Sequence, residues 1–333
     1  MHIQIALRVL GILMMMFSVT MLPPVIVSLI FQDGVEVVFL LAFTITFVVG
    51  LFLWLVFHRN DADMRIKDGF LVTVFYYLAL GIFGALPFIN EGGLGLSLPD
   101  ALFESFSGLT TTGATVIVGL DHLPESILYY RQQLQWLGGM GIIVLAVAVL
   151  PMLGIGGMQL YRAETPGPVK DSKLTPRIKE TALALWSIYL GLTVVCALAY
   201  WAAGMSLFDA VCHSFSTIAI GGFSTHDASI GYFDSAIIES IAIFFMILAG
   251  INFGLHFFAL KEKSALHYLR DDEVRFYLSI LAISTVIVTT GLWLENVLSP
   301  GQSIRMGLFE VVSIFTTTGF ATTDFAAWPG MLP

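Results

Sequence analysis

The stretch SLPDALFESFSGLTTTGAT, residues 97–115, recurs in altered form as SLFDAVCHSFSTIAIGGFS at 206–224 and SIRMGLFEVVSIFTTTGFA at 303–321. The three stretches align without a gap. Their shared positions are Ser97, Ser206 and Ser303, then Ser107, Ser216 and Ser313, and then Gly113, Gly222 and Gly319. The glycines are separated by 222 − 113 = 109 and 319 − 222 = 97 residues, a period that indicates a duplicated unit.

The composition places these stretches in an integral membrane protein. Of 333 residues, 57% are hydrophobic and 12% are charged, about half the charged fraction of a soluble domain. The mean hydropathy is +0.88, which excludes a cytosolic enzyme, a secreted disulfide scaffold and a disordered regulator. A net charge of −9 argues against nucleic acid as a partner. Cys196 and Cys212 lie in or beside apolar segments and are predicted to be free thiols.

Runs of roughly 20 mostly apolar residues predict the membrane spans. They lie at 3–31, 35–57, 69–89, 127–153, 181–203, 236–260 and 276–297. Basic residues gather in alternate loops, which the positive-inside rule makes cytoplasmic together with the N-terminus. These residues are Arg59, Arg65 and Lys67, then Arg162, Lys170, Lys173, Arg177 and Lys179, and then Lys261, Lys263, Arg270 and Arg275. The opposite loops are acidic and would concentrate cations at the outer face.

Each of the three stretches begins with a helix start signal. Ser97 with Asp100, and Ser206 with Asp209, have the S-x-x-D spacing of a capping box. Ser303 keeps the capping residue but has Met306 at the fourth position, so a weaker cap is expected there. About 11 residues of helix follow, roughly 16 Å, which crosses only half a bilayer. The chain must then return by an extended route that lines a water-filled path.

The returning stretches have the composition of an ion filter. They read Thr110-Thr111-Thr112-Gly113, Ala219-Ile220-Gly221-Gly222 and Thr316-Thr317-Thr318-Gly319. Glycine accepts positive φ, and β-branched Thr and Ile are expected to keep the strand extended. Rings of carbonyl oxygens replace the hydration shell of a monovalent cation. A single T-T-T-G is weak evidence, but its recurrence predicts potassium sites at Thr111, Thr112, Ile220, Gly221, Thr317 and Thr318.

Several polar residues in apolar surroundings are weighed between structural and functional roles. Arg131 is predicted to form a structural pair with Glu104 or another nearby carboxylate, in preference to a role in conduction. Glu104, His213 and Glu310 share one repeat position and either attract ions or anchor the short helices. His226 with Asp227 is interpreted as an outer-loop hydrogen bond in preference to a metal site. These residues are Glu104, Arg131, His213, His226, Asp227 and Glu310.

The chain resembles the Trk-type potassium uptake family, in the superfamily that includes the KtrB and plant HKT transporters. The resemblance runs over essentially the whole chain. It is carried by FESFSGLTTTGATVIVGLD, LQWLGGMGIIVLAVAVLPMLGIGGMQLYRAETPGPVKD and HSFSTIAIGGFSTHDASIGYFDS. It implies an all-α integral membrane fold with potassium-channel-like repeats of span, pore helix, filter strand and span. Serine at the position of Gly113 accompanies sodium permeation in plant relatives, so Gly113 implies potassium.

The resemblance also implies partners and a location. These are a homodimer in the bacterial inner membrane and a cytoplasmic, nucleotide-binding regulatory ring of the TrkA type. Contact with that ring is expected at the basic loops 162–179 and 261–275. The potassium ion is the only ion or small-molecule ligand that the resemblance implies.

The resemblance divides the chain into four parts. Residues 1–68 form two leading spans, 69–160 repeat 1, 161–274 a cytoplasmic loop with repeat 2 and the following loop, and 275–333 a partial repeat 3 that ends after its filter strand. The family has four repeats around one pore. The chain is therefore expected to be a piece of a longer protein, or to be completed by a separate chain, and not to conduct selectively alone.

Three functions are compared on this basis. The leading hypothesis is potassium uptake through a channel-like pore with a backbone-carbonyl filter. The alternative is a sodium- or proton-coupled symporter, in which the ions would bind at broken helices near the middle of the membrane. Repeats that share one topology favour a pore over a symporter. The third is an intramembrane enzyme built on Asp209 and His213. No nucleophile and base accompany these two residues, so the protein is predicted not to be an enzyme.

Overall fold

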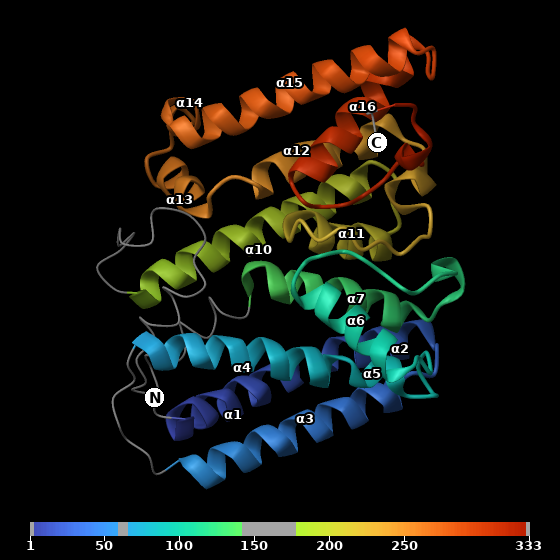
Figure 1. The fold of residues 1–333 in the computed structure, drawn as a ribbon. Helices are drawn as coiled ribbons and strands as arrows, with labels where there is room; N and C mark the ends of the chain where they lie inside the picture. The colour runs from blue at the N-terminus through green and yellow to red at the C-terminus, as the bar shows by residue number, and fades with distance from the viewer. Residues whose placement is uncertain (1–2, 59–65, 142–177, 331–333) are drawn as a thin grey trace.

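The computed structural model describes residues 3–58, 66–141 and 178–330, and within these ranges every regular element is a helix (Figure 1). The all-α prediction is confirmed. The α-helices are α1 Ile3–Val19, α2 Leu22–Phe31, α3 Glu36–Phe57, α4 Ile66–Gly84, α5 Leu86–Ile89, α6 Leu98–Leu109, α7 Glu125–Trp136, α10 Ile178–Ala202, α11 Leu207–Ile218, α12 Ala236–Ala249, α13 Phe253–Lys261, α14 Leu266–Arg270, α15 Asp272–Leu294 and α16 Pro300–Phe315. Short 3-10 or π turns are η1 Leu120–His122, η2 Leu137–Gly141, η5 Ser229–Phe233 and η6 Phe325–Ala327.

Within the described ranges, five helical segments are each long and apolar enough to cross a membrane, in agreement with five of the predicted spans. They are Ile3–Phe31, Glu36–Phe57, Leu71–Ile89, Leu183–Ala202 and Asp272–Leu294. The predicted span at 127–153 is described only to residue 141, where α7 continues into the π turn η2. The basic residues Arg59, Arg65, Arg162, Lys170, Lys173 and Arg177 lie outside the described residues.

The predicted span at 236–260 consists of two helices in the structure, which together are long and apolar enough to cross a membrane. The chain bends by 94° between α12 and α13. The side chain of Asn252 accepts a hydrogen bond from Gly254 N at 2.9 Å and so starts a new helix. Across the bend, His256 Nε2 lies 3.0 Å from Leu248 O. Hydropathy could not reveal this break, because the residues on both sides of it remain apolar.

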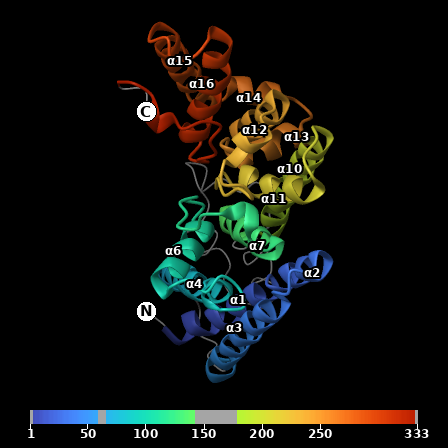
Figure 2. The same cartoon turned by 90° about the vertical axis from the view of Figure 1, so that its right-hand side faces the viewer.

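The helices form two packed groups that meet at α7. One hydrophobic core joins α1, α3, α4 and α7, and a second joins α10, α12, α15 and α16. Trp136, near the end of α7, packs against both cores. Figures 1 and 2 show the chain progressing from the α1–α3 group to the α15–α16 group, with α7 and α11 side by side between them. The short helices α6, α11 and α16 all lie toward the right-hand side of Figure 1.

Two of the three predicted helix caps are confirmed. The Ser97 hydroxyl oxygen accepts a hydrogen bond from Asp100 N at 3.4 Å, and the Ser206 hydroxyl oxygen accepts one from Asp209 N at 3.0 Å. The helices that follow, α6 and α11, have 12 residues each. At about 18 Å they are too short to span a bilayer.

The predicted cap at Ser303 is wrong, because α16 begins one turn earlier at Pro300. Proline has no N–H and a fixed φ, which suits the first helical position. Ser303 lies inside the helix, buried, with its hydroxyl 3.3 Å from Leu298 O. The N-cap residue is Ser299, whose side chain caps no backbone N–H. The third short helix is therefore longer, at 16 residues.

We expect Ser206→Ala to lower the free energy of unfolding by about 1 kcal/mol, because it removes an acceptor from the first turn of α11. The measurement is thermal unfolding of the purified protein in detergent, with ion preference retained. Ser299→Ala is the matched control, since Ser299 holds the same N-cap position without capping an N–H. Equal destabilisation by the two substitutions would contradict the capping role of Ser206.

Candidate functional site

The three short helices end in the same backbone turn. In the first, Thr111 N donates to Gly108 O at 3.0 Å and Thr112 N donates to Ser107 O at 2.9 Å. This pair of bonds is a Schellman motif. The other two helices repeat it with Ile220 N to Thr217 O at 3.1 Å, Gly221 N to Ser216 O at 2.8 Å, Thr317 N to Ile314 O at 2.9 Å and Thr318 N to Ser313 O at 2.9 Å. The repeat inferred from the sequence is therefore also a repeat of backbone geometry.

The turn places a β-branched residue in the left-handed region each time. The φ values are 53° at Thr111, 48° at Ile220 and 62° at Thr317. The prediction that these residues keep the strand extended is wrong, since the Schellman turn requires positive φ at this position. Such a residue costs on the order of 1–3 kcal/mol and persists only where its surroundings hold it. Its recurrence in three register-matched places indicates a functional site.

The glycine predicted to take positive φ does so in all three segments, with 76° at Gly113, 80° at Gly222 and 81° at Gly319. The glycines also allow close approach. A Cβ on Gly113 would lie 2.1 Å from Gly221 O, and a Cβ on Gly222 would lie 1.9 Å from Thr318 O. Around Gly319, no described atom lies within 4 Å of such a Cβ. The three segments thus meet in chain order, each glycine of the first two against a carbonyl of the next segment.

The shared acidic or histidine position holds each returning strand to its own short helix. Glu104, His213 and Glu310 are all buried. Glu104 accepts hydrogen bonds from Val116 N at 3.3 Å and from Thr115 Oγ1 at 2.9 Å. Glu310 accepts from Thr322 N at 2.7 Å and from Thr322 Oγ1 at 2.9 Å. The His213 ring nitrogen Nε2 lies 2.9 Å from Ser224 Oγ. Of the two roles left open by the sequence, anchoring is the one these contacts support.

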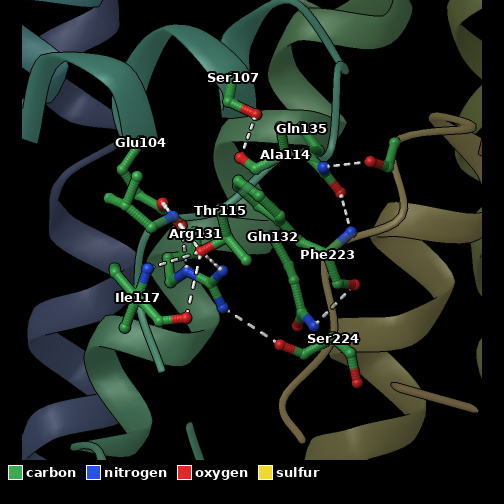
Figure 3. A network of polar contacts seen from close by, with 12 residues as sticks. Glu104, Ser107, Ala114, Thr115, Ile117, Arg131, Gln132, Gln135, Phe223 and Ser224 are labelled. Carbon is green, nitrogen blue, oxygen red and sulfur yellow. Dashed lines mark hydrogen bonds and ion pairs between the residues drawn. The ribbon is translucent and has the colours of Figure 1, made fainter. Parts of the chain in front are cut away.

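Arg131 on α7 forms the predicted pair with Glu104, at 2.7 Å between Nε and Oε1, and both side chains are 0% exposed (Figure 3). The guanidinium also donates to Thr115 Oγ1 at 3.0 Å and to Ser224 O at 3.2 Å. Its carbon atom lies 4.3 Å from the centre of the Phe223 ring. One buried cation therefore joins the first short helix to the strands that follow the first and second glycines.

Sequence reasoning missed two further side chains on α7. Gln132 and Gln135 are fully buried and bond to the backbone of Phe223 and Gly221. The sequence feature that could have indicated them is the presence of three glutamines, at 132, 133 and 135, inside a predicted membrane span. Their partners lie 86 to 91 residues away in the chain, so local pattern could not identify them.

The outer loops of the first two repeats are linked by hydrogen bonds, as predicted for His226 and Asp227. His226 Nδ1 lies 2.5 Å from Asp121 Oδ1, and Gly119 N donates to Asp227 Oδ1 at 3.0 Å. Partial burial disfavours the charged imidazole, but the neighbouring carboxylates of Asp209 and Asp121 raise the pKa of His226 above its usual value. Within the described ranges, no cluster of three or more His, Cys, Asp or Glu could hold a metal ion.

We expect Arg131→Met to cost about 3–5 kcal/mol of unfolding free energy, because it leaves the Glu104 carboxylate buried without its partner. Adding Glu104→Gln should recover part of this loss, since a neutral amide is cheaper to bury. Thermal unfolding in detergent of the two single variants and the double variant measures the effect. An Arg131→Met protein as stable as the wild type would contradict the pairing.

Comparison with known proteins identifies the family of this chain. The family model described as "TrkH: Cation transport protein" matches residues 35–332. The Trk system potassium uptake protein TrkH of Halomonas elongata is 58% identical over 100% of this chain and 69% of its own length. The protein of the same name from Escherichia coli is 53% identical with the same coverage, and TrkG of Escherichia coli is 42% identical over 98% of this chain and 68% of its own length.

A solved structure shares the fold. The crystal structure of the potassium transporter TrkH from Vibrio parahaemolyticus has a TM-score of 0.87 and 48% identity, and the match covers 99% of this chain and 68% of that one. The resemblance to the Trk-type family is thereby confirmed. The chain belongs to the TrkH family of cation transport proteins.

Proposed function

We propose that this chain forms part of a potassium uptake protein that passes the ion through a channel-like pore. The pore is lined by residues 110–113, 219–222 and 316–319, with potassium held at Thr111, Thr112, Ile220, Gly221, Thr317 and Thr318. The names of the relatives, potassium uptake proteins of the Trk system, support the choice of ion. The observation that carries the proposal is the close packing of Gly113 against the carbonyl oxygen of Gly221, and of Gly222 against the carbonyl oxygen of Thr318.

Backbone chemistry explains how such a site selects an ion. Carbonyl oxygens replace the water that a monovalent cation loses on entry. The C-terminal end of each short helix carries partial negative charge and lies beside the same segments. The hydroxyls of Thr110 and Thr112, and those of Thr316 and Thr318, pair with each other at 2.8 Å. The oxygens that we propose for the ion are those of the backbone.

The remaining side of the pore follows from the same geometry. A Cβ on either of the first two glycines would meet a carbonyl of the next segment, whereas no described atom lies within 4 Å of a Cβ on Gly319. We propose that a fourth wall closes the pore on that side. The chain spans about two thirds of the length of its TrkH relatives, 69% in the first two.

The two other functions are less well supported. A sodium- or proton-coupled symporter would use inverted or rocking repeats, whereas these three segments share direction, register and helix-ending turn. The contacts of Asp209 and His213 argue against an enzyme active site built on these two residues. Asp209 bonds to Ser206 and Thr225, while His213 lies 2.9 Å from Ser224 Oγ, so both side chains serve the local fold.

The surroundings of the pore are proposed as follows. The chain is multi-pass in the bacterial inner membrane, with a cytoplasmic N-terminus, as a homodimer. The parts at 1–68, 69–160, 161–274 and 275–333 correspond to the leading spans and the three repeats. A nucleotide-binding ring of the TrkA type docks on the cytoplasmic basic loops. Among the described residues these include Lys261, the last residue of α13, and Lys263, between α13 and α14.

We expect Gly113→Ser to lower the potassium-to-sodium permeability ratio of the complete transporter. The new Cβ would lie 2.1 Å from Gly221 O, in a residue whose φ is +76°, so the carbonyls must move. Flux into vesicles that contain the reconstituted transporter gives the ratio. Gly119→Ser is the matched control, because Gly119 has the same φ of +76° and no described atom within 4 Å of its added Cβ. Equal ratios for the two variants would rule out Gly113 as a filter residue.

A further inference from the structure

We propose that Gln135, assisted by Gln132, is a positioning residue that holds the second filter segment in its ion-selective conformation. The proposal rests on the function proposed above and adds a specificity-determining role for α7. It starts from a difference among the three repeats. The first and third contain Thr-Thr-Thr-Gly, whereas the second contains Ala219-Ile220-Gly221-Gly222.

The first and third segments are braced by their own side chains. The hydroxyls of Thr110 and Thr112 lie 2.8 Å apart, and so do those of Thr316 and Thr318. A serine one turn back, at 107 and 313, adds a second brace. The Ser107 hydroxyl donates to Ala114 O at 2.5 Å, and the Ser313 hydroxyl donates to Phe320 O at 2.6 Å.

The second segment lacks both braces. Ala219 and Gly221 stand where the other repeats have the paired threonines. Ser216 occupies the equivalent serine position, but its buried hydroxyl has no hydrogen-bond partner among the described residues. The carbonyl it would reach, Phe223 O, instead accepts from Gln132 Nε2 at 3.2 Å. Two consecutive glycines also make this segment the most flexible of the three.

Gln135 supplies the missing brace from outside the repeat. Its Nε2 donates to Gly221 O at 2.5 Å, and its Oε1 accepts from Phe223 N at 3.0 Å. These two backbone groups flank Gly222, so the carboxamide pairs with them as an adjacent β-strand would (Figure 3). The side chain is 0% exposed, which leaves water unable to compete for either bond.

The fit between Gln135 and Gly221 explains the sequence difference. A Cβ on Gly221 would lie 2.5 Å from Gln135 Cδ. A threonine at 221, as at the matching positions 112 and 318, is therefore incompatible with Gln135 in this place. Glycine at 221 and glutamine at 135 form one complementary pair.

The helix that carries Gln135 is itself fixed from the opposite side. Gln133 Nε2 donates to Thr20 O at 2.7 Å, at the junction of α1 and α2. Ser126 N, in the first turn of α7, donates to Asp33 Oδ2 at 2.9 Å. The leading helices thus hold α7, and α7 in turn holds the second filter segment.

The test uses two substitutions of Gln135 in the complete transporter. Gln135→Leu removes both polar atoms, and Gln135→Glu keeps the shape of the side chain. Gln135→Glu keeps the acceptor for Phe223 N and loses the donor to Gly221 O. Both variants should lower the potassium-to-sodium permeability ratio, by about tenfold for Gln135→Leu, the order expected for two lost hydrogen bonds. Gln133→Leu is the matched control, since it removes a buried glutamine that faces away from the filter. It should lower the melting temperature and lower the ratio less than Gln135→Leu does, because it loosens the anchor of α7 at Thr20 and leaves both hydrogen bonds of Gln135 in place.

A rescue variant separates positioning from general stability. Gln135→Ala combined with Ala219→Thr and Gly221→Thr rebuilds the threonine brace of the other repeats in the space that Gln135 vacates. Its ratio should rise above that of Gln135→Leu. If Gln135→Leu does not fold, Gln135→Glu and the rescue variant decide the question.

The outcomes distinguish the two proposals. A wild-type ratio in folded Gln135→Leu or Gln135→Glu, whatever its melting temperature, overturns the role of Gln135. If Gly113→Ser lowers the ratio in the same assay, the proposed function survives that result. If Gly113→Ser also leaves the ratio unchanged, the filter itself is wrongly assigned.

Discussion

A chain that enters a bilayer as a short helix and turns back must bond its backbone groups without help from water. This constraint shapes all three repeats. Each short helix ends in the same pair of backbone bonds, and each accepts a left-handed β-branched residue to make them, at Thr111, Ile220 and Thr317. The strands that follow are then tied back to their own helices by Glu104, His213 and Glu310.

The helix α7 connects the repeats to one another and to the leading helices. Arg131 and Gln135 on this helix reach residues of the first and second repeats, and Gln133 reaches the leading helices. A buried charge such as Arg131 is expensive to desolvate, and a buried ion pair by itself is weak evidence for stability. Its contacts with Thr115 and Ser224 indicate that its main effect is to fix where the two strands lie.

The repeats are alike in backbone and unlike in their means of support. Threonine hydroxyl pairs brace the first and third segments, and a carboxamide from another helix braces the second. Three repeats of one backbone geometry therefore do not require three repeats of one sequence. The departure at Ala219 and Gly221 is a complement to Gln135, since the glycine makes room for the side chain that replaces the lost hydroxyls.

The amino-acid sequence by itself determined the features that depend on neighbours along the chain. Hydrophobic runs predicted seven spans, five of which are helical segments long enough to cross a membrane in the described residues. The spacing of serine and aspartate predicted the caps at Ser97 and Ser206, and the gapless alignment predicted the three repeats with their positive-φ glycines. The pairing of Arg131 with Glu104 also followed, because a charge within a span must find a partner. Tertiary structure alone decided the support of Gly221 by Gln135 and the close approach of Gly113 and Gly222 to a carbonyl of the next segment. These depend on which helix faces which across 86 or more residues of chain, and hydropathy and local spacing contain no information about that choice.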